Sequence, residues 1–200
     1  MKNYNLDRIL VPAFKLFLTY NYEKVSTSML ELETGLTRGA IFYKLKSKEE
    51  IFQAVIDKFI LQTQSTNYKF SEIKSTTLKK FIAEYLQRVD YTMEKILSFE
   101  IENLHRAYFS LIYQALQYYP GFDKKITDIF SSELILWETI IQKAKEVGEI
   151  KASCDTKVTA QKFRYTYSGL SFEQSLLKGL DTNELKKIFY SYYNDIKNEK

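Results

Sequence analysis

The 200-residue sequence is poor in the residues that build disulfides, metal sites and tight turns: it has one Cys, one His, two Pro and six Gly. A lone Cys154 cannot close an intrachain disulfide, which excludes the disulfide scaffolds of small secreted proteins. One His and one Cys, far apart in the sequence, leave no set of zinc ligands and weaken the case for a Cys–His nucleophile. We therefore expect no catalytic residues, no metal, no cofactor and no enzymatic activity.

Long apolar runs are missing as well, since no stretch approaches the roughly 18 residues that a membrane span needs. Charge of one sign is only slightly in excess, because 29 Lys and Arg stand against 25 Asp and Glu, a net charge of +4. An excess this small does not by itself indicate a polyanionic partner, so the placement of the charges must decide. We expect a cytoplasmic protein without a membrane partner.

The scarce Gly and Pro cannot supply the turns of a many-stranded protein, whereas Leu, Ile, Lys, Glu and Gln recur at helical spacing. The sequence therefore predicts an all-α fold. The first helix has an apolar stripe from Leu6 to Leu18, interrupted by Pro12, which predicts a kink there or a helix that begins near Pro12. Further on, the periodicity predicts helices over residues 76–95, 96–103, 105–119, 122–147, 156–180 and 182–197.

Two short helices separated by Gly35 follow the first helix. Ser26 or Thr27 can cap the first of the pair, and Thr37 can cap the second, over residues 38–44. The apolar residues of the pair are spaced to pack on one another, at Leu30, Leu36 and Ile41. This arrangement predicts a helix-turn-helix, with residues 38–44 as its recognition helix.

A longer amphipathic helix, the linking helix, is expected over about residues 47–64. Ser47 and Glu50, three residues apart, form a capping box that begins it. We predict an N-terminal three-helix helix-turn-helix domain over residues 1–48. The C-terminal helical domain is then expected over residues 49–200, with the linking helix at its start.

Basic residues concentrate in the helix-turn-helix. No acid lies between Glu33 and Glu49, where four bases occur, namely Arg38, Lys44, Lys46 and Lys48. The start of a recognition helix meets base edges in the major groove, and Gly39 there suits a close approach of the backbone to DNA or to a neighbouring helix. The residues expected to face DNA are Thr27, Ser28, Thr37, Arg38, Gly39, Ala40, Phe42, Tyr43, Lys44 and Lys48.

This segment resembles the DNA-binding segment of the tetracycline-repressor (TetR) family of bacterial transcriptional regulators. The resemblance rests on Thr34-Gly35-Leu36-Thr37-Arg38-Gly39-Ala40-Ile41-Phe42-Tyr43, Ser47-Lys48-Glu49-Glu50 and, upstream, Ile9-Leu10, Ala13, Leu16-Phe17 and Tyr22-Glu23. It implies that Lys48 is the phosphate-contacting lysine and that the recognition-helix contacts are Thr37, Arg38, Ala40, Phe42, Tyr43 and Lys44. Pro12, Leu45 and Lys46 depart from the family pattern without removing a DNA-facing group.

The resemblance also implies a homodimer whose second domain binds a small organic effector. Apolar faces on the helices expected over 122–147 and 156–180 predict a dimer interface that includes Phe130, Leu134, Ile141, Phe163, Leu170 and Leu177. Aromatic side chains with polar tips predict an effector site lined by Met93, Phe99, Tyr108, Ile112, Tyr113, Trp137 and Tyr167. The alternative for both sets is an ordinary internal core.

The leading hypothesis is a ligand-responsive regulator, a repressor that binds double-stranded DNA at a palindromic operator as a homodimer. An all-helical small-molecule-binding protein or enzyme with no DNA role is the competing hypothesis. A third alternative is a helix-turn-helix used for protein contacts. Only the regulator predicts tight binding that depends on a palindromic sequence.

Overall fold

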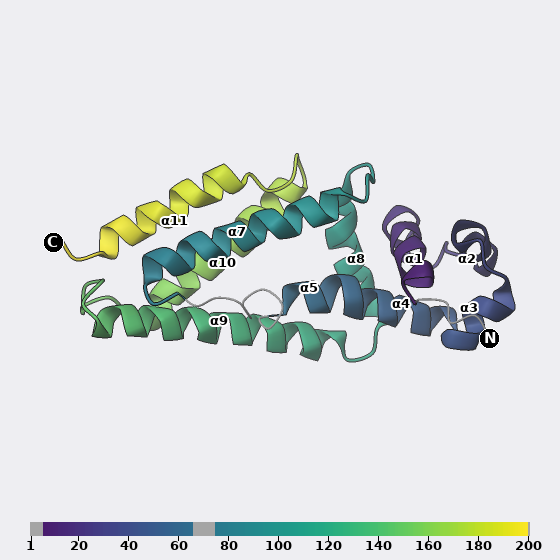
Figure 1. Ribbon diagram of the computed structural model, residues 1–200, viewed down its shortest axis with the longest axis horizontal. Helices are drawn as coiled ribbons and strands as arrows, with labels where there is room; N and C mark the ends of the chain where they lie inside the picture. Colours follow the sequence, from purple (N-terminus) through teal and green to yellow (C-terminus); the bar gives the residue numbers. More distant parts are fainter. Residues whose placement is uncertain (1–5, 66–74, 200) are drawn as a thin grey trace. The chain divides into compact units, whose positions relative to one another are not determined.

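The computed structural model describes residues 6–65 and 75–199 and confirms the all-α fold (Figure 1). Among these residues the only β-pairing is a single antiparallel bridge between Ile150 and Lys197. The elements in chain order are α1 (Asp7–Thr19), α2 (Thr27–Thr34), α3 (Arg38–Lys44), α4 (Lys48–Ile56), a π-helical turn η1 (Asp57–Leu61), α5 (Gln62–Gln64), α7 (Leu78–Leu97), α8 (Leu104–Tyr118), α9 (Phe122–Glu146), α10 (Thr156–Ser175) and α11 (Thr182–Ile196).

The chain forms two compact units. Unit 1 contains the chain up to Thr63 together with Leu97–Ile126, and unit 2 contains Gln64–Ile96 together with Thr127–Lys200. Helix α8 therefore belongs to the unit of the helix-turn-helix, although the sequence separates them by α7. The functional boundary predicted after residue 48 is a different division and stays a prediction.

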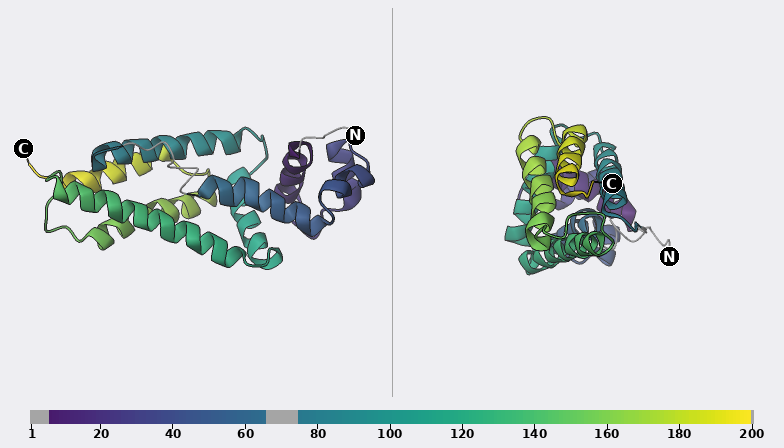
Figure 2. Two further views of the ribbon diagram at one scale, coloured as in Figure 1. Left: turned by 60° about the horizontal axis from the view of Figure 1, so that its bottom comes forward. Right: turned by 90° about the vertical axis from the view of Figure 1, so that its left-hand side faces the viewer.

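The core of unit 1 is built around α1, which packs on α2, α4 and α8 (Figure 2). Phe14 and Phe17 of α1 are fully buried. The Phe14 ring stacks on Phe59 with centroids 4.3 Å apart and meets Phe99 edge-on at 5.0 Å. Phe17 meets Phe52 edge-on at 5.0 Å. These aromatic pairs fix the linking helix and the segment before α8 against α1.

Pro12 lies inside α1, which begins at Asp7. The prediction that the helix begins near Pro12 was wrong, because the turn before the proline is helical and Ile9 and Leu10 in it are buried. Burial of these two side chains, worth about 1.5–3 kcal/mol each, offsets a hydrogen bond that the proline cannot donate.

The linking helix runs to Gln64, as expected, but it contains the π-helical turn Asp57–Leu61. Its buried pairs are Ile51 with Phe52, Val55 with Ile56, and Ile60 with Leu61. The pairs are four and then five residues apart, so the wider turn takes up one extra residue and keeps all three pairs on one face.

Two predicted helix boundaries were wrong. Residues 98–103 form turns rather than a helix, because Glu100 and Asn103 adopt positive φ angles of 54° and 53°. Helix α10 ends at Ser175 rather than near residue 180, and Gly179 beyond it has a φ of 89°. Left-handed residues do not continue a right-handed helix.

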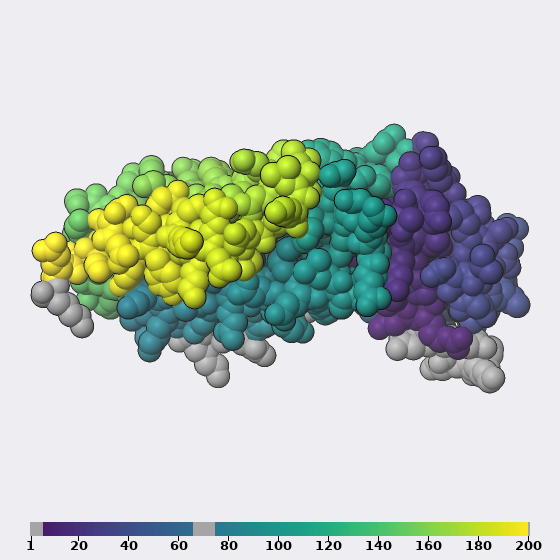
Figure 3. Space-filling model, turned by 90° about the horizontal axis from the view of Figure 1, so that it is seen from above, coloured from purple at the N-terminus to yellow at the C-terminus, as the bar shows by residue number. Residues whose placement is uncertain are grey.

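The core of unit 2 is aromatic and comes from α7, α9, α10 and α11, with α10 and α11 side by side (Figures 2 and 3). Trp137 at its centre is fully buried and stacks on Phe163 with centroids 4.7 Å apart and planes within 4°. Phe81 meets the Trp137 ring edge-on at 4.7 Å. The Glu149 carboxylate accepts the backbone N–H groups of Leu78 and Lys79 at 2.7 and 3.0 Å, which satisfies the free amides at the start of α7.

Candidate nucleic-acid interface

The helix-turn-helix is held by local capping bonds, as predicted. The Ser26 hydroxyl accepts from the Met29 N–H at 3.3 Å and begins α2. Gly35 ends that helix with a φ of 63°, a conformation that other residues adopt only at a cost. The Thr37 hydroxyl accepts from the Ala40 N–H at 3.3 Å and begins α3, the predicted recognition helix.

A carboxylate links the two helices across the turn. The Arg38 backbone N–H donates to Glu31 Oε1 at 2.7 Å, so α2 directly satisfies one of the free amides at the start of α3. Glu31 does not stand out in the sequence by spacing or motif. The sequence feature that could have pointed to Glu31 is an acid shortly before the start of a helix, where negative charge is favourable.

Helix α3 turns one face to the core and another to solvent. Ile41 is fully buried, and Phe42 is half-buried below the Arg38 guanidinium, whose carbon lies 6.0 Å from the ring centroid. Tyr43 is 68% exposed, which leaves its hydroxyl free to reach an outside partner. Of the predicted DNA-facing residues, those exposed to solvent are Ser28, Thr37, Arg38, Gly39, Tyr43 and Lys44; Thr27 and Ala40 are half-buried.

Space around Gly39 is open. A Cβ at this position would have no neighbour within 4 Å, and the residue has no positive φ. A tight contact with a neighbouring helix, one of the two explanations for this glycine, is therefore excluded for residues 6–65 and 75–199. The remaining explanation is a close approach of an outside partner to the recognition-helix backbone.

Lys48 is half-buried and already has a partner. Its ammonium Nζ donates to the Tyr22 backbone oxygen at 3.1 Å and lies 4.4 Å from the centroid of the Tyr22 ring. An ammonium has three donors, so this bond leaves two for a phosphate. Ser47 begins α4 by accepting the Glu50 N–H at 3.2 Å, and the Glu50 carboxylate accepts the Lys46 N–H at 2.8 Å.

The residues predicted to line an effector site do not gather in one unit. Phe99, Tyr108, Ile112 and Tyr113 belong to unit 1, whereas Met93, Trp137 and Tyr167 belong to unit 2. Phe99 packs on Phe14 and Phe59 in the core described above. Trp137 has aromatic neighbours on several sides and is fully buried, while Tyr113 is 61% exposed. The assignment of these residues to an effector stays a prediction.

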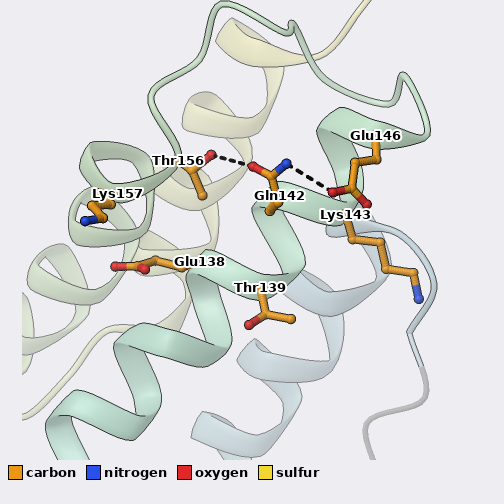
Figure 4. A pocket seen from close by; sticks show the side chains of 7 residues that line it. All are labelled: Glu138, Thr139, Gln142, Lys143, Glu146, Thr156 and Lys157. Atoms are coloured by element: carbon orange, nitrogen blue, oxygen red, sulfur yellow. Dashed lines mark hydrogen bonds between the residues drawn. The ribbon is translucent and has the colours of Figure 1, made fainter.

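An open hollow of about 670 Å³ lies between α9 and α10 in unit 2 (Figure 4). The residues that line it are Glu138, Thr139, Gln142, Lys143, Glu146, Thr156 and Lys157. Thr156 donates to Gln142 Oε1 at 3.2 Å, and Gln142 donates in turn to Glu146 at 3.1 Å. Nothing in the sequence pattern indicated this hollow, in which three of the seven lining side chains bond to one another.

Two of the predicted dimer residues need correction. Ile141 and Phe163 have no exposed surface, because both lie in the core of unit 2 around Trp137, so neither can contact a partner. Phe130 and Leu177 are exposed, and Leu134 and Leu170 are half-buried. Exposed residues also form a stripe on one face of α10 at Val158, Tyr165, Gly169 and Phe172, and the stripe continues to Leu176, which caps the helix, at steps of seven, four, three and four residues.

Unit 2 contains a buried charged group that helical periodicity did not indicate. The Glu133 carboxylate accepts the Tyr85 hydroxyl at 2.9 Å, and its other oxygen lies 3.9 Å from Arg164 Nε. Both charged side chains are at least nine-tenths buried. Burial and the nearby Glu133 charge hold the pKa of the Tyr85 hydroxyl well above its ordinary value. The guanidinium carbon of Arg164 also lies 4.5 Å from the Phe130 ring centroid.

Over residues 6–65 and 75–199, no three His, Cys, Asp or Glu side chains come close enough together to hold a metal ion. Within the same ranges, no helix has the length and apolar character of a membrane span.

The N-terminal part of the chain matches a known family. Residues 9–55 match the family model described as bacterial regulatory proteins, tetR family. The matched residues include most of α1, the helix-turn-helix and most of α4. No match exists among curated proteins.

Solved structures share the fold over nearly the whole chain. A TetR transcription regulator from Haloarcula marismortui ATCC 43049 has a TM-score of 0.72 at 14% identity, with 96% of this chain and 97% of that chain covered. A putative transcriptional regulator from Saccharomonospora viridis, in complex with choline, has a TM-score of 0.65 at 15% identity, with 96% and 97% covered. NalD of Pseudomonas aeruginosa, the secondary repressor of the MexAB-OprM multidrug efflux pump, has a TM-score of 0.64 at 14% identity, with 96% of each chain covered.

Proposed function

Because the chain belongs to the tetR family of bacterial regulatory proteins and carries that family's DNA-binding domain, we propose that it represses transcription as a homodimer on a palindromic operator. A small organic effector bound by the C-terminal helices changes its affinity for DNA, and the protein acts in the cytoplasm. DNA binding and transcriptional regulation follow from the family; the proposal concerns the assembly, the operator and the effector.

The exposed face of α3 is the single observation that carries this proposal. Arg38, Tyr43 and Lys44 are exposed on a helix whose Ile41 is fixed in the core, and Gly39 leaves its backbone open. A short helix fixed in this way suits the major groove, where Arg38 can meet a guanine edge and Tyr43 a phosphate. Lys44 adds positive charge to the same face.

The exposed stripe of α10 supports a homodimer. Val158, Tyr165, Phe172 and Leu176 are between 43% and 55% exposed, and Gly169 among them leaves room for a close approach of another helix. Apolar stripes of this kind are energetically unfavourable in water and suit a two-fold interface, where the same face of each copy meets the other. Two-fold symmetry of the protein is what a palindromic operator requires.

The choline complex of the Saccharomonospora viridis regulator supports an effector in this fold. An effector can alter DNA affinity only if it binds the two arrangements of the dimer with different affinities. We therefore expect DNA affinity to change when the effector is present, and the effector to bind DNA-bound and DNA-free protein unequally.

A salt-titrated gel shift on the DNA upstream of the chain's own gene tests the proposal. Wild-type protein should select a palindromic sequence, with half-sites about one helical turn apart or somewhat more. Arg38→Ala should relax selection at one base position and cost about 1–3 kcal/mol if Arg38 reads a base. Lys44→Ala should weaken binding to all sequences and flatten the salt dependence by about one phosphate contact.

Exposed lysines outside the DNA-binding unit provide the matched control. Lys186→Ala removes the same charge from α11 and should leave DNA binding unchanged. Binding that ignores the palindrome, or that survives both DNA-site substitutions at full strength, would contradict the proposal.

A further inference from the structure

The Lys48 ammonium is fixed by one residue, Tyr22, in the turn between α1 and α2. The backbone oxygen of Tyr22 accepts one ammonium proton at 3.1 Å, and its ring lies 4.4 Å from the same nitrogen. A free lysine side chain has up to about 2 kcal/mol of rotamer entropy to lose when it binds a phosphate. Lys48 has given up part of that freedom before any DNA arrives, so its position depends on the position of Tyr22.

Tyr22 is held in turn by α8. Its backbone N–H donates to Gln114 Oε1 at 2.6 Å, and its ring stacks on Tyr118 with centroids 4.4 Å apart. The Tyr118 hydroxyl donates to Glu23, the next residue in the same turn, at 2.5 Å. These are contacts between residues more than 90 positions apart in the sequence, and all of them lie within unit 1.

The other contacts of the Tyr22 side chain come from α4 and from Phe17 of α1, whose ring centroid lies 6.1 Å from that of Tyr22. Its hydroxyl donates to Glu49 Oε1 at 2.8 Å, and its ring meets Phe52 edge-on at 4.8 Å. These partners contact only the side chain of Tyr22 and leave its backbone N–H to another acceptor. Gln114 is the residue that fixes the backbone of the turn from outside the helix-turn-helix.

We propose that Gln114 is a positioning residue for DNA binding, which acts by holding the Tyr22 backbone in the place where it fixes the Lys48 ammonium for a phosphate. The inference rests on the proposed DNA-binding function and adds a regulatory route to it. The helices before and after α8, namely α7 and α9, both contribute to the core of unit 2. A change in α8 would therefore reach a phosphate contact through Gln114 and Tyr22.

A double-mutant cycle tests the route, with a labelled duplex of mixed sequence as the probe and fluorescence anisotropy at several salt concentrations as the readout. Gln114→Leu removes the acceptor of the Tyr22 N–H and should weaken DNA binding about tenfold. This is the effect expected when the charge-assisted contact of Lys48 with a phosphate is lost. The substitution should also reduce the salt slope by about 0.9, the contribution of one phosphate. In a Lys48→Met background the same substitution should change affinity by less than about twofold.

Two further variants separate positioning from a general structural role. Gln114→Glu keeps an acceptor for the Tyr22 N–H and should retain wild-type affinity and salt slope. Gln117→Leu, an exposed glutamine on the same helix, is the matched control and should bind as wild type does. If Gln114→Leu lowers the melting temperature so much that the protein unfolds in the assay, Gln114→Asn takes its place in the cycle. Asparagine is one methylene shorter, so its oxygen no longer reaches the Tyr22 N–H.

Equal losses from Gln114→Leu in the wild-type and Lys48→Met backgrounds would overturn the inference, as would an unchanged salt slope. These results would leave the proposed function standing, because wild-type protein would still bind the duplex. Failure of the wild-type protein itself to bind any duplex would instead overturn the proposed function.

Discussion

The backbone N–H of Arg38 donates a 2.7 Å hydrogen bond to the carboxylate of Glu31, seven residues earlier in the chain. One acidic side chain thus joins the two helices of the helix-turn-helix and places negative charge at the start of the recognition helix, where the helix dipole favours it. We expect Glu31→Ala to lower the free energy of unfolding by about 1 kcal/mol, since a capping interaction is lost.

Hydrogen exchange and urea unfolding measure this effect. The Arg38 amide should exchange faster in Glu31→Ala and remain protected in Glu31→Gln, which keeps an acceptor. Glu33→Ala, an exposed acid on the same helix, serves as the control. An unchanged exchange rate at Arg38 in Glu31→Ala would refute the role of this carboxylate.

Gly39 and Gly35 should respond in opposite ways to alanine. Gly39 has an open Cβ position without a positive φ, so Gly39→Ala should raise the free energy of unfolding by about 0.5–1 kcal/mol. Gly35 has a φ of 63°, so Gly35→Ala should lower the free energy of unfolding by about 1 kcal/mol.

The more stable Gly39→Ala protein should nevertheless bind DNA more weakly, because its methyl group occupies the space next to the helix backbone. Calorimetry measures the change in stability, and fluorescence anisotropy measures the change in DNA affinity on the same samples. Stronger DNA binding by Gly39→Ala would count against a close approach of DNA to the backbone at this residue.

Removal of the buried Arg164 charge should be costly. Arg164→Leu leaves the Glu133 carboxylate buried without its cationic neighbour and should destabilise the chain by about 3 kcal/mol or more. Combining Arg164→Leu with Glu133→Gln should recover most of that loss, because no charge is then buried and the Tyr85 hydroxyl keeps an acceptor. Urea unfolding of the two single variants and the double variant measures the coupling. Equal and additive losses would show that the pair does not act as a unit.

The dimer proposal predicts that a charge on the α10 stripe separates the two subunits. Phe172→Glu and Tyr165→Glu should each give a monomer at concentrations where wild-type protein is a dimer, since a charge would be buried at the interface. Sedimentation equilibrium distinguishes the two states. Ile135→Glu, at a 61% exposed position on α9, tests the neighbouring helix and should leave the dimer intact. A dimer that survives both α10 substitutions and fails with Ile135→Glu would move the interface to α9.

Protonation of His105 should destabilise the folded chain in mild acid. Burial lowers the pKa of its imidazole below the ordinary value of 6.5, so the unfolded chain takes up a proton at a higher pH than the folded chain. The contribution of His105 to the free energy of unfolding is therefore complete above about pH 6.5. It is lost as the pH falls through that value towards the lowered pKa of the folded state. His105→Gln should reduce this fall, which urea midpoints at about pH 7.5 and about pH 5.5 would show. An identical fall in both proteins would assign the loss to other groups.

Local sequence was sufficient for most of the helix-turn-helix. Ser26, Thr37 and Ser47 cap helices as predicted, because a hydroxyl and an amide three residues apart meet in almost any helix start. The Glu31–Arg38 bond could not be predicted from spacing, since it forms only when the turn at Gly35 brings the two helices together. The same holds for Gln114 and Tyr22, which are neighbours only in the folded chain.

Periodicity predicted apolar faces but not what covers them. Ile141 and Phe163 lie on the faces expected for a dimer, yet both are covered by other helices of their own chain. The stripe on α10 was not recognised because Gly169 and the polar residues around it dilute the apolar pattern. Which of two similar faces is internal depends on how four helices pack, and that information lies outside any single helix.

The π-helical turn sets the rotational phase of the last part of the linking helix, Phe59 to Leu61. Without the wider turn between Asp57 and Leu61, an ordinary helix of the same residues would rotate Ile60 and Leu61 by about 100° relative to Val55 and Ile56. Those two buried side chains would then leave their common face, and Phe59 would leave the Phe14 ring on which it stacks. The turn thus holds one residue more than an ordinary helix needs, so a one-residue deletion between Ile56 and Ile60 should give an ordinary helix in which the three buried pairs, now evenly four residues apart, keep their common face.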